Sequence, residues 1–405
     1  MESIKKIFKI GYGPSSSHTM APRRASVIFR EKNRDASKFV VTLYGSLAAT
    51  GKGHLTDVAI FDELGMDHTT ILWEPKVFLP EHPNGMKFEA YNSIGKIIDS
   101  WTTFSTGGGD ISDDGRRKTR LDGEQIYPYT KMSEILGFCQ RRGVSFWEYV
   151  QMHEDSDLWD YLMEVWSVMK DSIQEGLDNE GVLPGDLNLP RRASSFLMHA
   201  KSYHESMQRR GLLFAYALAV AEQNASGGKI VTAPTCGSCG VLPAVLSIIQ
   251  KNADFSDKRV LKALATAGLI GNLIKENASI SGAEVGCQGE IGSACSMASA
   301  ASVQLYGGSP AQVEYGASMG IEHFLGLTCD PVCGLVQVPC IERNSFAAAR
   351  AMDVNQYALM SDGTHLVSFD TVVEAMKQTG HDIPSLYKET SEGGLASLMG
   401  MKRKR

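Results

Sequence analysis

The residue pattern changes across one segment rich in Gly, Pro and Asn, and this change constrains the fold more than any other feature. Leu177–Pro190 reads LDNEGVLPGDLNLP, which is typical of a linker. Before it, short runs of β-forming residues alternate with turns, and after it apolar residues recur at helical spacing. We therefore expect an α+β domain over residues 1–150, a connecting segment and linker over 151–190, and a mostly α-helical domain over 191–405.

The first part contains four runs with the residue types of β-strands. They are Phe39–Tyr44, Thr69–Trp73, Met86–Tyr91 and Ile97–Phe104. The string HPNG at His82–Gly85 predicts the turn that precedes the third of these strands.

The second part contains segments whose apolar residues repeat every three or four positions. Glu205–Asn224 and Ser256–Asn277 are predicted helices on this pattern. Ser293–Leu305 is rich in Ala, Ser and Met, which favours a helix packed tightly against its neighbours.

Charge and hydrophobicity exclude several classes of protein. The chain has 40 basic and 46 acidic residues, a net charge of −6, which argues against nucleic-acid binding. Apolar stretches such as Leu212–Ala221 and Val241–Ile249 are only about half the length of a membrane span. The first residues, MESIKKIFKIG, lack the apolar region of a signal peptide. We expect a cytoplasmic protein that binds neither nucleic acid nor membrane.

Seven of the eight cysteines lie between Cys236 and Cys340. In a reducing compartment such clustered thiols indicate a metal or redox site rather than disulfides. The alternative is that they are small core residues. Cys236 and Cys239 form a CxxC pair, but no second pair follows at the spacing of a zinc site.

A serine-rich string, GYGPSSSHT, occupies Gly11–Thr19. If a helix begins here, its free N–H groups and the hydroxyls suit a carboxylate or a phosphate. His18 could then act as an acid or a base. The alternative is an ordinary helix cap beside a solvated histidine.

The string GSLAATGKGH at Gly45–His54 resembles a phosphate-binding P-loop, but its spacing excludes one. Five residues rather than four separate Gly45 from Gly51, and Gly53 stands where Ser or Thr is required. What remains is Lys52 and His54 directly after a predicted strand, a suitable place for a general base.

Three further cysteines lie in separate strings of Gly, Pro and polar residues. They are Cys287, Cys329 and Cys340. Three thiolates from separate loops would hold an iron–sulfur cluster by three corners and leave one iron open. An open iron is a Lewis acid that can bind a substrate hydroxyl.

These strings together resemble the iron–sulfur-dependent L-serine dehydratases (L-serine ammonia-lyases) of bacteria, in the single-chain form with a β-type domain fused to a helical catalytic domain. The resemblance covers nearly the whole chain. It is carried by GPSSSHT at 13–19, YGSLAATGKGH at 44–54, HPNG at 82–85, VTAPTCGSCGVLPAV at 231–245, ISGAEVGCQGEIGSACSMA at 280–298 and GLTCDPVCGLVQVPCIERN at 326–344.

The resemblance implies a fold, a cofactor and an assembly. The first domain would resemble the allosteric substrate-binding domain of a phosphoglycerate dehydrogenase. Cys287, Cys329 and Cys340 would bind a [4Fe–4S] cluster, with no pyridoxal phosphate, and the protein would be a homodimer.

The resemblance also implies a substrate, L-serine, and a reaction that yields pyruvate and ammonia. A base would remove the α-proton, with His54 the first candidate and His18 the second. The residues expected to bind the substrate are Ser15, Ser16, Ser17, His18, Thr19, Lys52 and Asn84.

The chain departs from the family pattern at two places. Many members have Asn where this chain has Cys236, and several have a cysteine near the C-terminus, where this chain reads SLMGMKRKR. Cys236, Cys239, Cys295 and Cys333 are interpreted as structural, with Cys236 the foremost exception. The alternative functions are a lyase acting on L-threonine or L-cysteine, an electron-transfer protein, and a non-catalytic serine or oxygen sensor.

Overall fold

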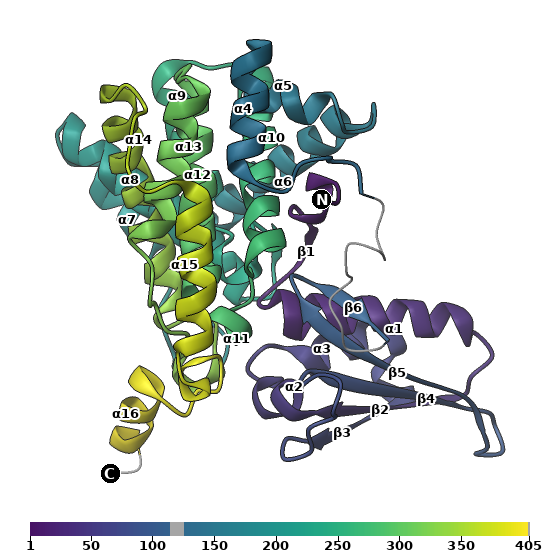
Figure 1. Cartoon of the computed structure of the whole chain (residues 1–405). Coiled ribbons are helices and arrows are strands. Elements are labelled where there is room, and N and C mark those ends of the chain that lie inside the picture. The colour runs from purple at the N-terminus through teal and green to yellow at the C-terminus, as the bar shows by residue number, and fades with distance from the viewer. Residues whose placement is uncertain (114–124, 404–405) are drawn as a thin grey trace.

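The computed structural model describes residues 1–113 and 125–403. A small α/β region with a mixed sheet packs beside a larger helical region, and the N-terminal segment passes from one to the other (Figure 1). The expected order, an α and β region followed by a mostly helical one, is confirmed.

The sheet has five strands in the order β3-β2-β4-β5-β6. The four predicted strands are present, and β6 adds a short edge: β2 is Lys38–Tyr44, β3 Thr69–Glu74, β4 Gly85–Tyr91, β5 Ile97–Gly107 and β6 Asp110–Ser112. Strands β2 and β3 are parallel and the other pairs are antiparallel. A parallel pair needs a crossover, which is formed by α2 (Gly45–Thr50) and α3 (Thr56–Leu64).

Helix α1 (Ala21–Lys32) covers one face of this sheet. Its Phe29 is fully buried and stacks on Trp101 of β5, with ring centroids 6.3 Å apart. Along β4, Phe88 is buried whereas the alternate residues are partly exposed, as expected for a strand with one covered face. The small core of the sheet region therefore lies between the sheet and α1.

The helical region contains the three predicted helices among its members. Its helices are α4 Met132–Arg142, α5 Phe146–Gln151, α6 Leu158–Asp178, α7 Ala193–Lys201, α8 Glu205–Ala225, α9 Val241–Ala253, α10 Asp257–Asn277, α11 Gly282–Val285, α12 Ile291–Leu305, α13 Pro310–Glu322, α14 Cys340–Met360, α15 Phe369–Asp382 and α16 Gly394–Arg403. In the described residues, no helix is both long enough and apolar enough to cross a membrane.

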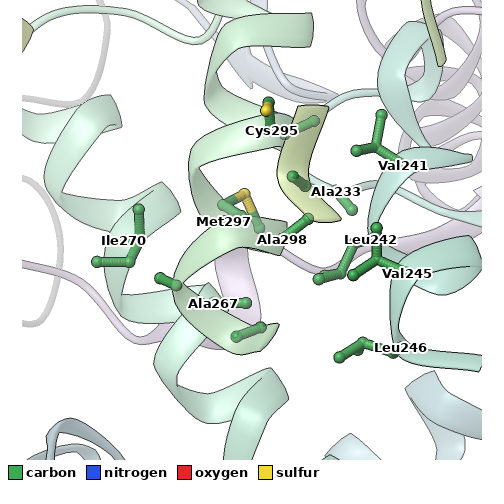
Figure 2. Packing of buried hydrophobic residues seen from close by; sticks show 14 of the residues in the cluster. Ala233, Val241, Leu242, Val245, Leu246, Ala267, Ile270, Cys295, Met297 and Ala298 are labelled. Carbon is green, nitrogen blue, oxygen red and sulfur yellow. The ribbon is translucent and has the colours of Figure 1, made fainter. Parts of the chain in front are cut away.

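Helix α12 lies at the centre of this region and is buried along nearly its whole length. Figure 2 shows its Met297 and Ala298 among apolar side chains of α9 and α10. Its small residues allow neighbouring backbones to come close: a Cβ atom on Gly320 of α13 would lie 2.6 Å from the Cα of Ser296. Tight packing of small side chains thus fixes the helices that carry the cysteines.

The N-terminal residues belong to the helical core rather than to the core of the sheet. Ile4, Ile7 and Phe8 are buried there, as are residues of α4, α5 and α6. Residues from the expected ranges 1–150 and 151–190 thus pack with the helical region. Since packing alone does not identify units that fold independently, the domain limits stay a prediction. In the expected linker, α6 ends at Asp178 and one β-bridge joins Val182 to Pro190.

Candidate active site

The serine-rich string is attached to the helical region before it enters the sheet region. Strand β1 (Ile10–Tyr12) pairs antiparallel with β7 (Lys229–Val231). At the end of α8, the Asn224 side chain donates a hydrogen bond of 2.9 Å to the carbonyl of Pro14. A Cβ atom on Gly13 would lie 2.1 Å from Asn224 Oδ1, so only glycine fits there. These contacts fix where the serine-rich string begins.

The string itself forms a helical turn, Ser16–Met20, that leads into α1. Ser15 caps this turn, since its Oγ accepts a hydrogen bond from the backbone N–H of His18 at 3.2 Å. Ser17 Oγ lies 2.9 Å from Nδ1 of the buried His18 ring. The helix start is present, but His18 is buried rather than solvated, which argues against the plain-cap alternative.

His18 and His54 meet edge to face, with ring centroids 4.6 Å apart. Both nitrogens of His18 have partners, because Nε2 lies 3.1 Å from Ser46 Oγ. His54 Nδ1 lies 3.4 Å from Thr50 Oγ1. Within residues 1–113 and 125–403, no hydrogen bond reaches His54 Nε2. No protein group of the described residues therefore occupies this nitrogen.

Burial keeps both histidines neutral. It lowers the pKa of His18 to about 4, and burial together with the neighbouring His18 lowers the pKa of His54 well below its usual value. A neutral imidazole can accept a proton, but one with a low pKa is a weak base. The chemistry at His54 therefore depends on a substrate whose proton has been made acidic.

The other candidate residues surround this pair. Thr19 Oγ1 donates to the carbonyl of His54 at 2.6 Å and so fastens the two segments together. Lys52 is exposed, with its ammonium 5.7 Å from the Trp73 ring centroid. It lines a cavity of about 460 Å³ whose lining includes Gly53 and Leu55, the chain neighbours of His54, but not His54 itself.

Asn84 is buried, and within the described ranges its side-chain oxygen has no hydrogen-bond partner. In the same turn, the carbonyl of Pro83 accepts from the N–H of Ser46, whose hydroxyl contacts His18. The turn therefore lies next to the histidine pair.

The three candidate cysteines come from three separate places in the helical region. Cys287 begins a short turn before α12, Cys329 lies in the loop between α13 and α14, and Cys340 is the first residue of α14. Cys287 and Cys329 are 2% and 4% exposed, and the Cys329 thiol donates to the sulfur of Cys287. Arg343, one turn after Cys340, also contacts Cys287.

The electrostatics of these thiols differ. The contact with Cys329, assisted by Arg343, lowers the pKa of Cys287 to about 6. The same contact raises the pKa of Cys329 well above its usual value, and burial raises the pKa of Cys340. Cys287 is therefore the thiol that ionises most readily here.

Three charged residues in this site were not predicted from the sequence: Glu290, Arg343 and Glu389. The carboxylates of Glu290 and Glu389 and the Cys329 sulfur lie within 4.8 Å of one another. Burial raises the pKa of both carboxyls, that of Glu389 to about 7. Glu290 and Arg343 each follow a predicted ligand by three positions, which is a usable signal. Glu389 lies far along the chain from the predicted ligands, and no sequence spacing marked it as a candidate.

One turn bridges the histidine and cysteine groups. The Cys236 sulfur lies 3.7 Å from Met20 Sδ, at the end of the serine-rich turn. The side chain of the preceding Thr235 hydrogen-bonds to Glu290. A second contact joins the loops directly, since a Cβ atom on Gly53 would lie 3.0 Å from the carbonyl of Gly334. The structure therefore brings the two groups to one place.

The donor set fits an iron–sulfur group. Three thiols converge from separate segments, largely buried, and the cation Arg343 lies beside them. Soft thiolate ligands select iron–sulfur clusters or zinc, and the other cysteines of the chain lie outside this set. Cys239 and Cys295 are buried, whereas Cys333 is exposed.

Comparison with known proteins shows the family to which the chain belongs. The family model of the serine dehydratase beta chain matches residues 3–68, and that of the serine dehydratase alpha chain matches residues 69–396. Together the two models cover nearly the whole chain, so the chain belongs to the serine dehydratase family. The boundary between the two models falls just before β3, inside the sheet.

Its relatives match over nearly their full length. An L-serine dehydratase of Streptomyces coelicolor is 40% identical, over 97% of this chain and 98% of its own. L-serine dehydratase TdcG of Escherichia coli is 41% identical, over 98% of this chain and 99% of its own. An L-serine dehydratase of Helicobacter pylori is 38% identical over similar shares.

Proposed function

We propose that this protein is an L-serine ammonia-lyase that converts L-serine to pyruvate and ammonia. Several L-serine dehydratases that are about 40% identical over the whole chain carry this proposal. The juxtaposed histidine and cysteine groups support it, since a dehydration needs both a base and an acceptor for the leaving hydroxide.

The proposed cofactor is a [4Fe–4S] cluster held by Cys287, Cys329 and Cys340. When bound, it would supply an open iron that acts as a Lewis acid toward the β-hydroxyl of serine. Arg343 would offset part of the negative charge of the three thiolates, because its guanidinium contacts Cys287 and is itself largely buried. Pyridoxal phosphate has no part in this proposal.

The serine-rich turn and its neighbours would bind the substrate carboxylate. Ser15 and Thr19 already make hydrogen bonds to His18 and His54, so they position the bases. Within the described ranges no hydrogen bond is made by the Ser16 hydroxyl, which leaves it free for a ligand. The side-chain oxygen of Asn84, which has no hydrogen-bond partner in the described residues, could accept a hydrogen bond from the α-amino group of serine. Lys52, which lines the cavity, would attract the carboxylate of serine.

His54 is the proposed base, because its Nε2 is free whereas both nitrogens of His18 are bonded. It would take the α-proton as the β-hydroxyl leaves, giving an aminoacrylate that tautomerises to an imine and hydrolyses. Ser17 and Ser46 hold His18 beside His54, where it would orient the base.

The assembly and the location are proposed from the resemblance to the family. We propose a homodimer in the cytoplasm, where its thiols would stay reduced; no disulfide joins the eight cysteines, all of which lie in the described residues. The likeness of the sheet region to the allosteric domain of a phosphoglycerate dehydrogenase is part of the same proposal, supported by a five-stranded mixed sheet with α1 on one face.

The test is pyruvate formation from L-serine by anaerobically purified protein, with half of the sample exposed to air beforehand. L-threonine and L-cysteine are assayed beside it. We expect pyruvate from L-serine in the anaerobic half and a loss of activity in the exposed half. Iron-loaded protein that forms no product from any of the three amino acids would refute the lyase. Activity that survives air would refute an exposed catalytic iron.

A further inference from the structure

Glu389 is held in the cysteine site by the backbone of a cysteine. The N–H of Cys329 donates to the carbonyl of Tyr387, and the N–H of Glu389 donates to the carbonyl of Cys329, each at 2.8 Å. Glu389 has a φ of 58°, a left-handed conformation that is costly for a residue with a side chain. The two hydrogen bonds hold Glu389 in this conformation beside Cys329.

Three ligand-type atoms gather around Gly282. A Cβ atom there would lie 2.6 Å from Glu389 Oε1, 2.9 Å from Glu290 Oε2 and 3.2 Å from Cys329 Sγ. Any other residue at position 282 would fill the space into which these atoms point. The glycine therefore leaves room for two carboxylates and a sulfur to approach one point.

The carboxylate of Glu389 also lacks a partner. Across residues 1–113 and 125–403, no hydrogen bond or ion pair is made to its oxygens, although the side chain lies beside Glu290 and the Cys329 thiol. A half-buried carboxylate that lies beside another carboxylate and a thiol is unfavourable unless a cation is bound near it. Arg343 does not supply that cation to Glu389, because its guanidinium is directed to Cys287, Asp330 and the carbonyl of Thr328.

We propose that Glu389 is the fourth protein ligand of the cluster, bound through a carboxylate oxygen to the iron that the three cysteines leave open. L-serine then replaces it by ligand exchange, with no change in oxidation state. A carboxylate suits this role because it is a harder and more exchangeable ligand than a thiolate. This inference rests on the proposed function, and specifically on the cluster.

The experiment compares the wild type with Glu389→Gln, Glu389→Cys and the control Glu392→Gln, each reconstituted anaerobically with ⁵⁷Fe. Glutamine keeps the size of the side chain but is a poor ligand, and Glu392 is an exposed carboxylate three residues away. Each protein is treated with a mild oxidant. Iron per chain, the EPR signal of three-iron clusters and the Mössbauer spectrum of the unique iron are followed.

Glu389→Gln is expected to lose its fourth iron at least about tenfold faster than the wild type, given the usual effect of ligand-shell changes on metal affinity. Glu389→Cys should retain the iron and shift the Mössbauer parameters of the unique site, and Glu392→Gln should match the wild type. L-serine should change the unique-site spectrum of the wild type far more than that of Glu389→Cys.

Two outcomes overturn the proposal, and they are distinguishable. A wild type that forms no cluster removes the cofactor and this inference together. A wild type that forms a cluster, with Glu389→Gln equal to it in iron retention and spectrum, removes only the role of Glu389. If Glu389→Cys retains its iron and shows a changed Mössbauer spectrum of the unique iron, a purely structural effect is excluded, because a misfolded segment would not supply a ligand.

Discussion

The helical region and the sheet region contribute to the site in different ways. The cysteines lie at helix ends and in loops against a core in which α12 is buried along nearly its whole length. The histidines lie on short turns of the sheet region, held by hydroxyl and backbone hydrogen bonds. The rigid helical core suits the cysteines, which would hold a bound cofactor in a fixed position. The position of the histidines instead depends on how the sheet region docks against the helical region.

Several close contacts dock the two regions against each other. Gly13 against Asn224, Met20 against Cys236, and Gly53 against Gly334 each join the two regions. This difference implies that changes on the cysteine side should remove iron and activity together, whereas changes on the histidine side should remove activity alone.

The largest effect is expected from the cysteines. Cys287→Ala, Cys329→Ala and Cys340→Ala should each lose iron and all measurable pyruvate formation, because each removes one of three thiolate ligands. Iron content, visible absorption and turnover are measured for each variant. Cys139→Ala, a buried cysteine of α4 outside the site, is the control and should keep its iron. Full activity in any of the three removes that residue from the ligand set.

His54→Ala should lower kcat by about 10²- to 10⁴-fold, the usual contribution of a general base, with iron content unchanged. His381→Ala, an exposed histidine at the end of α15, should be unaffected. Loss of iron together with activity in His54→Ala would contradict the separation of the two regions. An unchanged rate would transfer the role of base to His18 or to a serine hydroxyl.

Gly13→Ala tests the docking itself. The new Cβ would lie 2.1 Å from Asn224 Oδ1, so the serine-rich turn must shift. A displacement of about 1 Å near a reacting group can cost about 10²-fold in rate, and we expect a loss of that order in kcat/KM with iron retained. Gly137→Ala in α4, where a Cβ meets only the flexible end of Arg141, is the matched control. Equal kinetics in the two variants would show that docking at Gly13 is unimportant.

The smallest effect at neutral pH concerns His18. Its pKa is about 4 in the folded protein against a usual 6.5, so the unfolded chain binds more protons between these values. Its contribution to the free energy of unfolding is fully present above pH 6.5 and is lost as the pH falls to about 4, by up to about 3 kcal/mol. Unfolding of the wild type and His18→Gln is compared from pH 4 to 7. If the free energy of unfolding changes with pH in the same way in the wild type and in His18→Gln, this would contradict a buried, neutral His18.

The sequence predicted the parts of the fold that depend on local pattern. Phe39–Tyr44 and Glu205–Asn224 are found within a residue of their predicted bounds, because alternation and helical periodicity reflect one covered face. The site candidates came from motif strings, which also contain Glu290 and Arg343. Glu389 could not be found this way, because only the tertiary pairing of its backbone with Cys329 brings it there.

The placement of the N-terminal residues was also beyond local pattern. Ile4 and Phe8 pack on Gly268 of α10, where a Cβ would lie 2.9 Å from either side chain. Nothing in a short apolar run says which of two cores it joins. The same holds for the low pKa values of His18 and His54, which arise from burial between two regions rather than from their neighbours in sequence.

That contact between Ile4 and Gly268 has a consequence for synthesis. Ile4 leaves the ribosome more than 250 residues before Gly268 does, a delay of about 13–50 s at ordinary translation rates. During that interval the apolar residues 4–8 have no native partner, and the serine-rich turn that follows them cannot yet be fastened to Asn224. The sheet can form in the meantime, but the site can be completed only after much of the helical region has been translated. Nascent chains should therefore require protection over this stretch.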